Sequence, residues 1–217
     1  MSIDITPQDL EQAIIDKAFM LYYQPKVNFL TGRISGAEAL IRWHDSEKGF
    51  ISPDIFIPLA EKNGYITRIT EQIISLAIES AQTLKKQGLD IAIAVNTSPV
   101  DFMSNKVLNI LQTALDDKKI TPQDLKIELT ETATLEDNDQ IISNLNLLTT
   151  MGFELVMDDF GTGYSSIDLL SRLPFSTLKV DQGVIRRMVC STKSLNIVNT
   201  VINMARTLRM YLSLIHI

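Results

Sequence analysis

Residues 153–166 read FELVMDDFGTGYSS, and this stretch carries the strongest signal for the fold. The apolar run from Phe153 to Met157 stops at two adjacent acids, Asp158 and Asp159, and a loop with two glycines follows. Such a run is typical of a buried strand that leads into a loop. Buried neighbouring carboxylates repel each other and lose hydration, so they require a cation, for which a divalent metal is the natural candidate. A solvated acidic turn is the alternative explanation.

Four further strand-like runs also carry polar side chains near their ends. These are Glu38 in GAEALIRW, Asn96 after IAIAV, Glu128 and Glu131 in KIELTET, and Lys179 in TLKVD. Taken singly, each has a structural explanation, such as a surface acid, a turn-forming Asn or a partner for another charge. Their similar placement in successive strands is not explained in that way, and it predicts a shared site.

Composition limits the classes of function. A chain of 217 residues is within the range of one domain, and 45% hydrophobic with 21% charged residues is ordinary for a soluble globular protein. The net charge of -6, without a cluster of Lys and Arg, argues against binding a nucleic-acid polymer. It does not exclude a small anionic substrate, because a bound metal reverses the local charge. The single cysteine, Cys190, excludes an internal disulfide and fits a reducing compartment. We expect neither a signal peptide nor a membrane segment.

The order of the expected elements predicts an α/β fold. Strands are expected at 20–27, 34–43, 91–95, 125–129, 153–157 and 177–180, and helices after Thr6, at 53–61 and 66–81, around 107–115 and 141–148, at 165–170 and around 195–208. This alternation is typical of parallel βα units, which form either an open doubly wound sheet or a closed barrel. The polar groups follow several different strands on the carboxyl side, and no glycine-rich phosphate loop is present. The pattern therefore favours a TIM-type (β/α) barrel.

If Glu38, Asn96, Glu128 and Asp158 meet at one barrel mouth, they form an all-oxygen site. Such a site suits Mg²⁺ or Mn²⁺ better than zinc, and the chain has only two histidines. Asp159 would reach a second metal or a bridging water, and two metals ~3.5–4 Å apart would support phosphoryl transfer.

The remaining polar groups suggest roles around that site. Lys179 would orient a nucleophilic water and offset charge on the phosphate. Arg42 lies on the same strand face as Glu38 and would bind a phosphate. Glu131 lies just beyond its strand, and we interpret it as a holder of the 161–166 loop, which would close over substrate.

Together these motifs resemble the EAL domain family, whose name matches Glu38-Ala39-Leu40. Supporting matches, in family order, are YQP at 23–25, FIPLAE at 56–61, VNTS at 95–98, ELTE at 128–131, DDFGTGYSS at 158–166 and LKVD at 178–181. The resemblance covers about residues 10–210. It implies a TIM-type barrel with one antiparallel strand, and a Mg²⁺- or Mn²⁺-dependent phosphodiesterase that opens cyclic di-GMP to linear pGpG in the bacterial cytoplasm. It also implies frequent homodimers.

The resemblance also implies roles for individual residues. Glu38, Asn96, Glu128 and Asp158 match ligands of the first metal, Asp159 a ligand of the second, Lys179 the water-positioning residue and Glu131 the loop anchor. Gln24, Leu40 and Arg42 match contacts to the nucleotide. The main alternative is a catalytically inactive EAL module that binds cyclic di-GMP or a protein partner. An unrelated metal-dependent barrel enzyme is a third possibility.

The C-terminal part departs from the family. A Glu-Gly-Val-Glu strand and a later Gln that are typical of the family have no match after Met210. Because a full barrel has about 250 residues, we expect residues 1–217 to form a single EAL domain that lacks one or two βα units. We further expect a truncated reading frame in which residues 211–217 are foreign to the gene, and a polypeptide that is poorly active or inactive; a naturally shortened variant is the alternative. Ser176 and residues 182–184 also differ from the family pattern, which bears on loop coupling and dimerisation.

Overall fold

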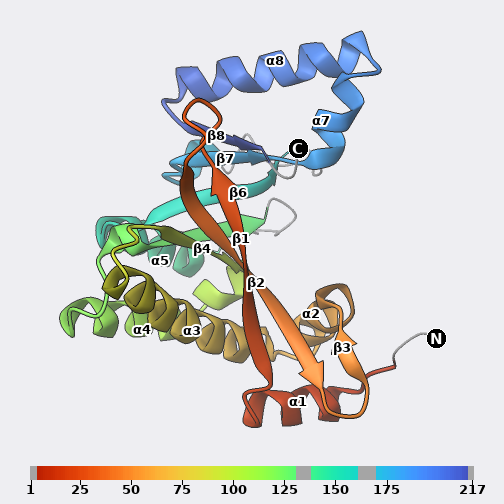
Figure 1. The fold of residues 1–217 in the computed structure, drawn as a ribbon, viewed down its shortest axis with the longest axis vertical. Coiled ribbons are helices and arrows are strands. Elements are labelled where there is room, and N and C mark those ends of the chain that lie inside the picture. The colour runs from red at the N-terminus through yellow and green to blue at the C-terminus, as the bar shows by residue number, and fades with distance from the viewer. Residues whose placement is uncertain (1–3, 131–137, 161–169, 215–217) are drawn as a thin grey trace.

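The structure, a computed structural model, describes residues 4–130, 138–160 and 170–214 (Figure 1). Its strands are β1 (Phe19–Val27), β2 (Ile34–Asp45), β3 (Gly49–Ile51), β4 (Ala92–Thr97), β5 (Leu125–Thr130), β6 (Glu154–Phe160), β7 (Thr177–Val180) and β8 (Tyr211–Leu214). Its helices are α1 (Pro7–Ile15), α2 (Pro53–Lys62), α3 (Ile66–Lys86), α4 (Lys106–Asp116), α5 (Asp139–Thr150), α7 (Gln182–Met188) and α8 (Thr192–Thr207), with short 3-10 turns η1 (Pro99–Phe102) and η2 (Pro122–Asp124).

The strands form one sheet in the order β1-β2-β4-β5-β6-β7-β8, with β3 paired to β2. From β2 to β8 each strand pairs in parallel with the next, whereas β1 and β3 run antiparallel to β2. A doubly wound sheet would reverse its strand order, and this order does not reverse. Among the described residues β1 and β8 are the two ends of the strand order and are not paired with each other. The curled sheet is therefore an open half-barrel rather than a closed barrel. The predicted TIM-like fold with an antiparallel strand is confirmed.

β2 joins the two parts of the sheet. Its residues 36–39 pair in parallel with β4, while the whole strand pairs with β1 and its end pairs with β3. Gly36 lies where β2 and β4 approach, and a Cβ there would come within 3.2 Å of the Ala92 carbonyl oxygen. Beyond the parallel stretch, Trp43 is buried against Phe19 and Phe56, with ring centroids 5.9 and 5.7 Å away. This aromatic cluster anchors α2 to the β1–β2 hairpin.

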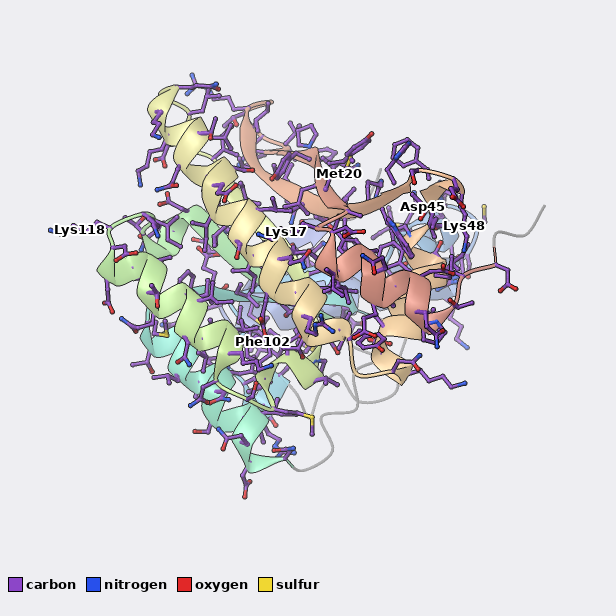
Figure 2. All side chains as sticks on the ribbon, turned by 90° about the horizontal axis from the view of Figure 1, so that it is seen from below. Lys17, Met20, Asp45, Lys48, Phe102 and Lys118 are labelled. Carbon is purple, nitrogen blue, oxygen red and sulfur yellow. The ribbon has the colours of Figure 1, made fainter. Side chains whose placement is uncertain are left out.

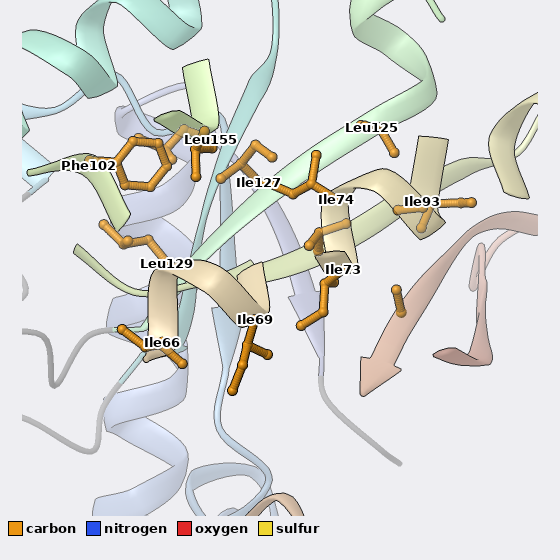
Figure 3. Packing of buried hydrophobic residues seen from close by; sticks show 14 of the residues in the cluster. Ile66, Ile69, Ile73, Ile74, Ile93, Phe102, Leu125, Ile127, Leu129 and Leu155 are labelled. Carbon is orange, nitrogen blue, oxygen red and sulfur yellow. The ribbon is translucent and has the colours of Figure 1, made fainter. Parts of the chain in front are cut away.

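The outer face of the sheet packs against helices (Figure 3). The helical spacing of Ile66, Ile69, Ile73 and Ile74 places these side chains on the buried face of α3, toward β4 and β5. α3 lies beside α4, and α5 packs against η1, which carries the buried Phe102 (Figure 2). This layer is the hydrophobic core that fixes the position of the strands.

Four short elements were not predicted, namely β3, α7 and the 3-10 turns η1 and η2, and the helix expected at 165–170 lies largely outside the described residues. β8 forms from the tail and pairs in register with β7, from Thr177 with Tyr211 to Val180 with Leu214. The origin of residues 211–217 stays a prediction. Within the described ranges, no helix is long and apolar enough to cross a membrane.

Candidate functional site

Three carboxylates from three strands meet on the inner face of the sheet. Glu38 of β2, Glu128 of β5 and Asp158 of β6 each have an oxygen within 4.8 Å of the others. Lys179 of β7 lies among them, and its Nζ is 3.1 Å from Glu38 Oε2, 2.5 Å from Glu128 Oε2 and 2.7 Å from Asp158 Oδ2. Four segments spread over 141 residues therefore converge at one point.

Strand pairing explains this convergence. Asn96 of β4 pairs with Glu128 in the parallel ladder, and its Nδ2 donates a hydrogen bond to Glu38 Oε1 at 3.2 Å. Alternate residues of a strand share a face, so the neighbours of Glu128 on β5, Ile127 and Leu129, point to the helices instead. The sequence prediction placed these groups at strand ends. Glu38 in fact lies inside the 12-residue β2, but at the carboxyl end of the part that pairs with β4.

The site is buried and its charges are strongly coupled. Glu128 is 0% exposed, Lys179 2% and Asp158 6%. Burial raises the pKa of Glu128, and Lys179 offsets this only in part. Burial alone would lower the pKa of Lys179, but Glu128, Asp158 and Glu38 outweigh that effect and raise it. This raised pKa favours a protonated Lys179 that donates hydrogen bonds to all three carboxylates.

Asp158 and Asp159 adopt different conformations, although they are adjacent. The prediction that both follow the strand is wrong, because β6 continues to Phe160. The pairing with β7 shifts between Met157 and Phe160, and Asp159 has a φ of 55°, which is a bulge in the strand. The Asp159 amide donates to Asp158 Oδ1 at 2.8 Å. Burial raises the pKa of the half-buried Asp159, and nearby acids such as Asp181 raise it further. The positive charge of Lys179 lowers this pKa but does not outweigh the two effects. The bulge keeps two successive carboxylates near one site.

Lys26 of β1 is a member of the site that sequence reasoning missed. Its Nζ lies 2.5 Å from Glu128 Oε1 and 4.0 Å from Glu38 Oε2. Together with Lys179 it overcomes the effect of burial on Glu38, whose pKa is lowered. The available signal was its spacing, because Lys26 lies two residues after Gln24 on the strand face that adjoins Glu38.

The three predicted nucleotide contacts lie along the same face of the β1–β2 hairpin. Gln24 pairs with Glu38, and Leu40 and Arg42 follow at alternate positions of β2. Arg42 lies four residues, roughly 13 Å, beyond Glu38, and its guanidinium stacks over the exposed Tyr22 ring at 5.5 Å from the centroid. The structure thus places Arg42 further along the hairpin face from the acid cluster rather than in it. Glu131 and the 161–166 loop lie outside the described residues.

The inner face also borders a large cavity of about 1080 Å³. Gln24, Lys26, Glu38 and Lys179 line one part of it. The rest is lined by residues toward the amino ends of the strands, including Ala92, Lys126, Glu154, Thr177 and Tyr211. Of the three clustered carboxylates, Glu38 therefore borders this hollow, together with the two lysines that contact the buried Glu128.

The donor set fits a divalent metal ion. Two ammonium groups face three carboxylates, which leaves one excess negative charge, and Asp159 adds another close by. Carboxylate oxygens are the ligands that Mg²⁺ and Mn²⁺ prefer. The buried acidic cluster is consistent with a metal site.

Comparison with known proteins agrees with this geometry. A model of the EAL domain family matches residues 7–214. The bifunctional diguanylate cyclase/cyclic di-GMP phosphodiesterase MucR of Pseudomonas aeruginosa is 37% identical over 203 residues, which are 93% of this chain and 30% of MucR. The cyclic di-GMP phosphodiesterase NbdA of the same organism is 34% identical over 94% of this chain and 26% of its own length. The chain thus spans about a quarter to a third of these relatives.

A solved structure of the P. aeruginosa MucR phosphodiesterase in complex with c-di-GMP is also similar. Its TM-score is 0.86 at 36% identity, over 95% of this chain and 84% of that one. The EAL enzyme Bd1971, solved with cAMP and cyclic di-GMP bound, gives a TM-score of 0.87 at 29% identity, over 95% of this chain and 57% of that one. These TM-scores show that both structures share the fold of the described residues.

Proposed function

Because the chain belongs to the EAL domain family, we propose that it hydrolyses cyclic di-GMP to linear pGpG in a metal-dependent reaction. The convergence of Glu38, Glu128 and Asp158 around Lys179 carries this proposal. Similarity to proteins named as cyclic di-GMP phosphodiesterases supports the choice of substrate. The proposal places the reaction in the bacterial cytoplasm, and homodimerisation stays a prediction.

The proposed roles follow from position. Glu38, Asn96, Glu128 and Asp158 would hold a first Mg²⁺ or Mn²⁺, and Asp159 a second. A bound divalent ion supplies a more acidic water and neutralises charge on the phosphate. Glu131 keeps its proposed role as anchor of the substrate loop.

The chain's own groups would act on the water and the nucleotide. Once bound metal takes carboxylate oxygens that Lys179 now contacts, its ammonium would have an N–H with which to donate to the attacking water, and it would oppose the charge that develops on the phosphate. Gln24, Leu40 and Arg42 would hold the nucleotide along the hairpin face, with the Arg42 guanidinium preorganised by its contact with Tyr22. The water would lose a proton as its oxygen bonds to phosphorus, the bond from phosphorus to one ribose 3′-oxygen would break, and that oxygen would take up a proton, so that one water is consumed.

The test is turnover of cyclic di-GMP with Mn²⁺, followed by chromatographic separation of pGpG. We expect slow product formation from the wild-type chain, in line with the poor activity predicted for it, and none from Asp158→Asn. Asp124→Asn is the matched control, because Asp124 is also buried and paired with a lysine, Lys85, but lies outside the site. It should keep its activity.

The same samples address the alternative of an inactive EAL module. If no product forms, calorimetric titration of cyclic di-GMP distinguishes two cases. Binding without turnover in both wild type and Asp158→Asn would support a receptor. The absence of both binding and turnover would contradict the assigned substrate.

A further inference from the structure

Lys26 differs from Lys179 although both ammonium groups contact Glu128. Lys179 is fixed by three carboxylates and its side chain is 3% exposed. The Lys26 side chain is 27% exposed and lines the cavity. It lies near the end of β1, where the register with β2 shifts. A turn follows, in which Asn28 Oδ1 accepts hydrogen bonds from Leu30 and Thr31. Lys26 is therefore held by fewer close contacts than Lys179 and is the more accessible of the two partners.

The two lysines divide the oxygens of Glu128 between them. Lys179 Nζ contacts Oε2, and Lys26 Nζ contacts Oε1 at 2.5 Å. A divalent ion that takes Glu128 as a ligand needs one of these oxygens. The exposed partner on Oε1 is the one that can be displaced, and its positive charge also opposes the incoming ion.

We propose that Lys26 competes with the divalent cation for Glu128 Oε1 and thereby sets the metal affinity of the site. This inference rests on the proposed metal-dependent function. Lys26 would be a positioning residue, since it acts through Glu128. In this arrangement Lys26 neutralises part of the acid cluster when no metal is bound, and the competition raises the free ion concentration at which the site is half occupied.

The experiment is calorimetric titration of Mn²⁺ alone into the intact chain and its variants, without nucleotide. Lys26→Met should bind Mn²⁺ about tenfold more tightly or better, because one cation is removed next to the ligand oxygen. Lys26→Arg should stay near the wild-type affinity, because it keeps the charge. Thermal unfolding with and without Mn²⁺ should show a larger stabilisation of Lys26→Met.

Lys126→Met is the matched control. Lys126 lies two residues from Glu128 on the same face of β5 and lines the same cavity, but it pairs with Glu154 at 2.6 Å. It should change the Mn²⁺ affinity by less than about threefold, because it contacts no proposed ligand.

Two failures can be told apart. If wild type and Asp158→Asn bind Mn²⁺ equally poorly, the metal site and the proposed function both fail. If Asp158→Asn abolishes Mn²⁺ binding but Lys26→Met matches wild type or binds more weakly, the function stands and the competition by Lys26 is overturned. An equal gain in Mn²⁺ affinity in Lys126→Met would also overturn the competition, since the gain would then come from the lower net charge of the protein and not from the contact with Glu128.

Discussion

The two faces of the six-residue strand β5 carry opposite kinds of side chain, apolar on one face and charged on the other. Leu125, Ile127 and Leu129 point outward into the core, where each is at most 1% exposed. Lys126 and Glu128 point to the hollow side, where both form ion pairs. The outer face is stabilised by apolar burial, whereas the inner face concentrates charge that burial makes costly. The comparison indicates that the outer face maintains the fold and the inner face serves the proposed reaction.

The largest expected effect comes from neutralising the inner face. Glu128→Gln should reduce cyclic di-GMP turnover about a thousandfold or more, because it removes a proposed metal ligand. Its effect on the free energy of unfolding should be small, since the charge that burial penalises is also removed. Product formation and urea unfolding measure the two effects. A large loss of stability with retained turnover would contradict the division between faces.

The adjacent residue on the outer face should behave in the opposite way. Ile127→Ala should lower the free energy of unfolding by about 3 kcal/mol, because it leaves a cavity in the packed layer between β5 and α3. Mn²⁺ affinity should change by less than about threefold. Urea unfolding and calorimetry on the same sample test this. A tenfold loss of Mn²⁺ affinity would show that the core and the site are coupled.

A smaller effect is expected for an acid that serves the fold. Asp124 accepts from the Thr121 amide at 2.6 Å and pairs with Lys85. Burial acts upward on its pKa, but the bonds from Thr121 and Lys85 outweigh it and lower the pKa below 3.8. The stabilisation of the folded state by ionised Asp124 is therefore complete above the pKa that Asp124 has in the unfolded chain. It is lost as the pH falls through the lower pKa that Asp124 has in the folded chain. Asp124→Asn should cost about 1 kcal/mol at pH 7 and less near pH 2.

Urea unfolding of both proteins between pH 7 and pH 2 measures that difference. A difference that grows as the pH falls would contradict the sign. Turnover at pH 7 should be the same in both, which separates this acid from Glu128.

The outer face was predictable because its signal is local. Apolar periodicity in α3 and the run before Asn96 predicted the elements, and strand position predicted that Glu38, Glu128 and Asp158 would meet. The contact between Lys26 and Glu128 spans 102 residues and depends on the β1–β2 register, which periodicity does not specify. Likewise, the positive φ of Asp159 belongs to a bulge where the pairing of β6 with β7 shifts register. The apolar pattern ends at Met157 and does not reveal that the strand continues through this bulge, so the sequence placed the strand end too early.

The smallest effect tests how far the inner face extends along the hairpin. Tyr22→Leu should weaken cyclic di-GMP binding about threefold, because it removes a cation–π contact of roughly 0.5–1 kcal/mol that holds Arg42. Tyr65→Leu is the matched control, since Arg68 stacks over Tyr65 at 5.8 Å on α3, away from the hairpin face. Calorimetry at fixed Mn²⁺ compares the two. Equal losses would mean that the effect is one of stability, whereas a loss only in Tyr22→Leu would extend the binding face from Glu38 to Arg42.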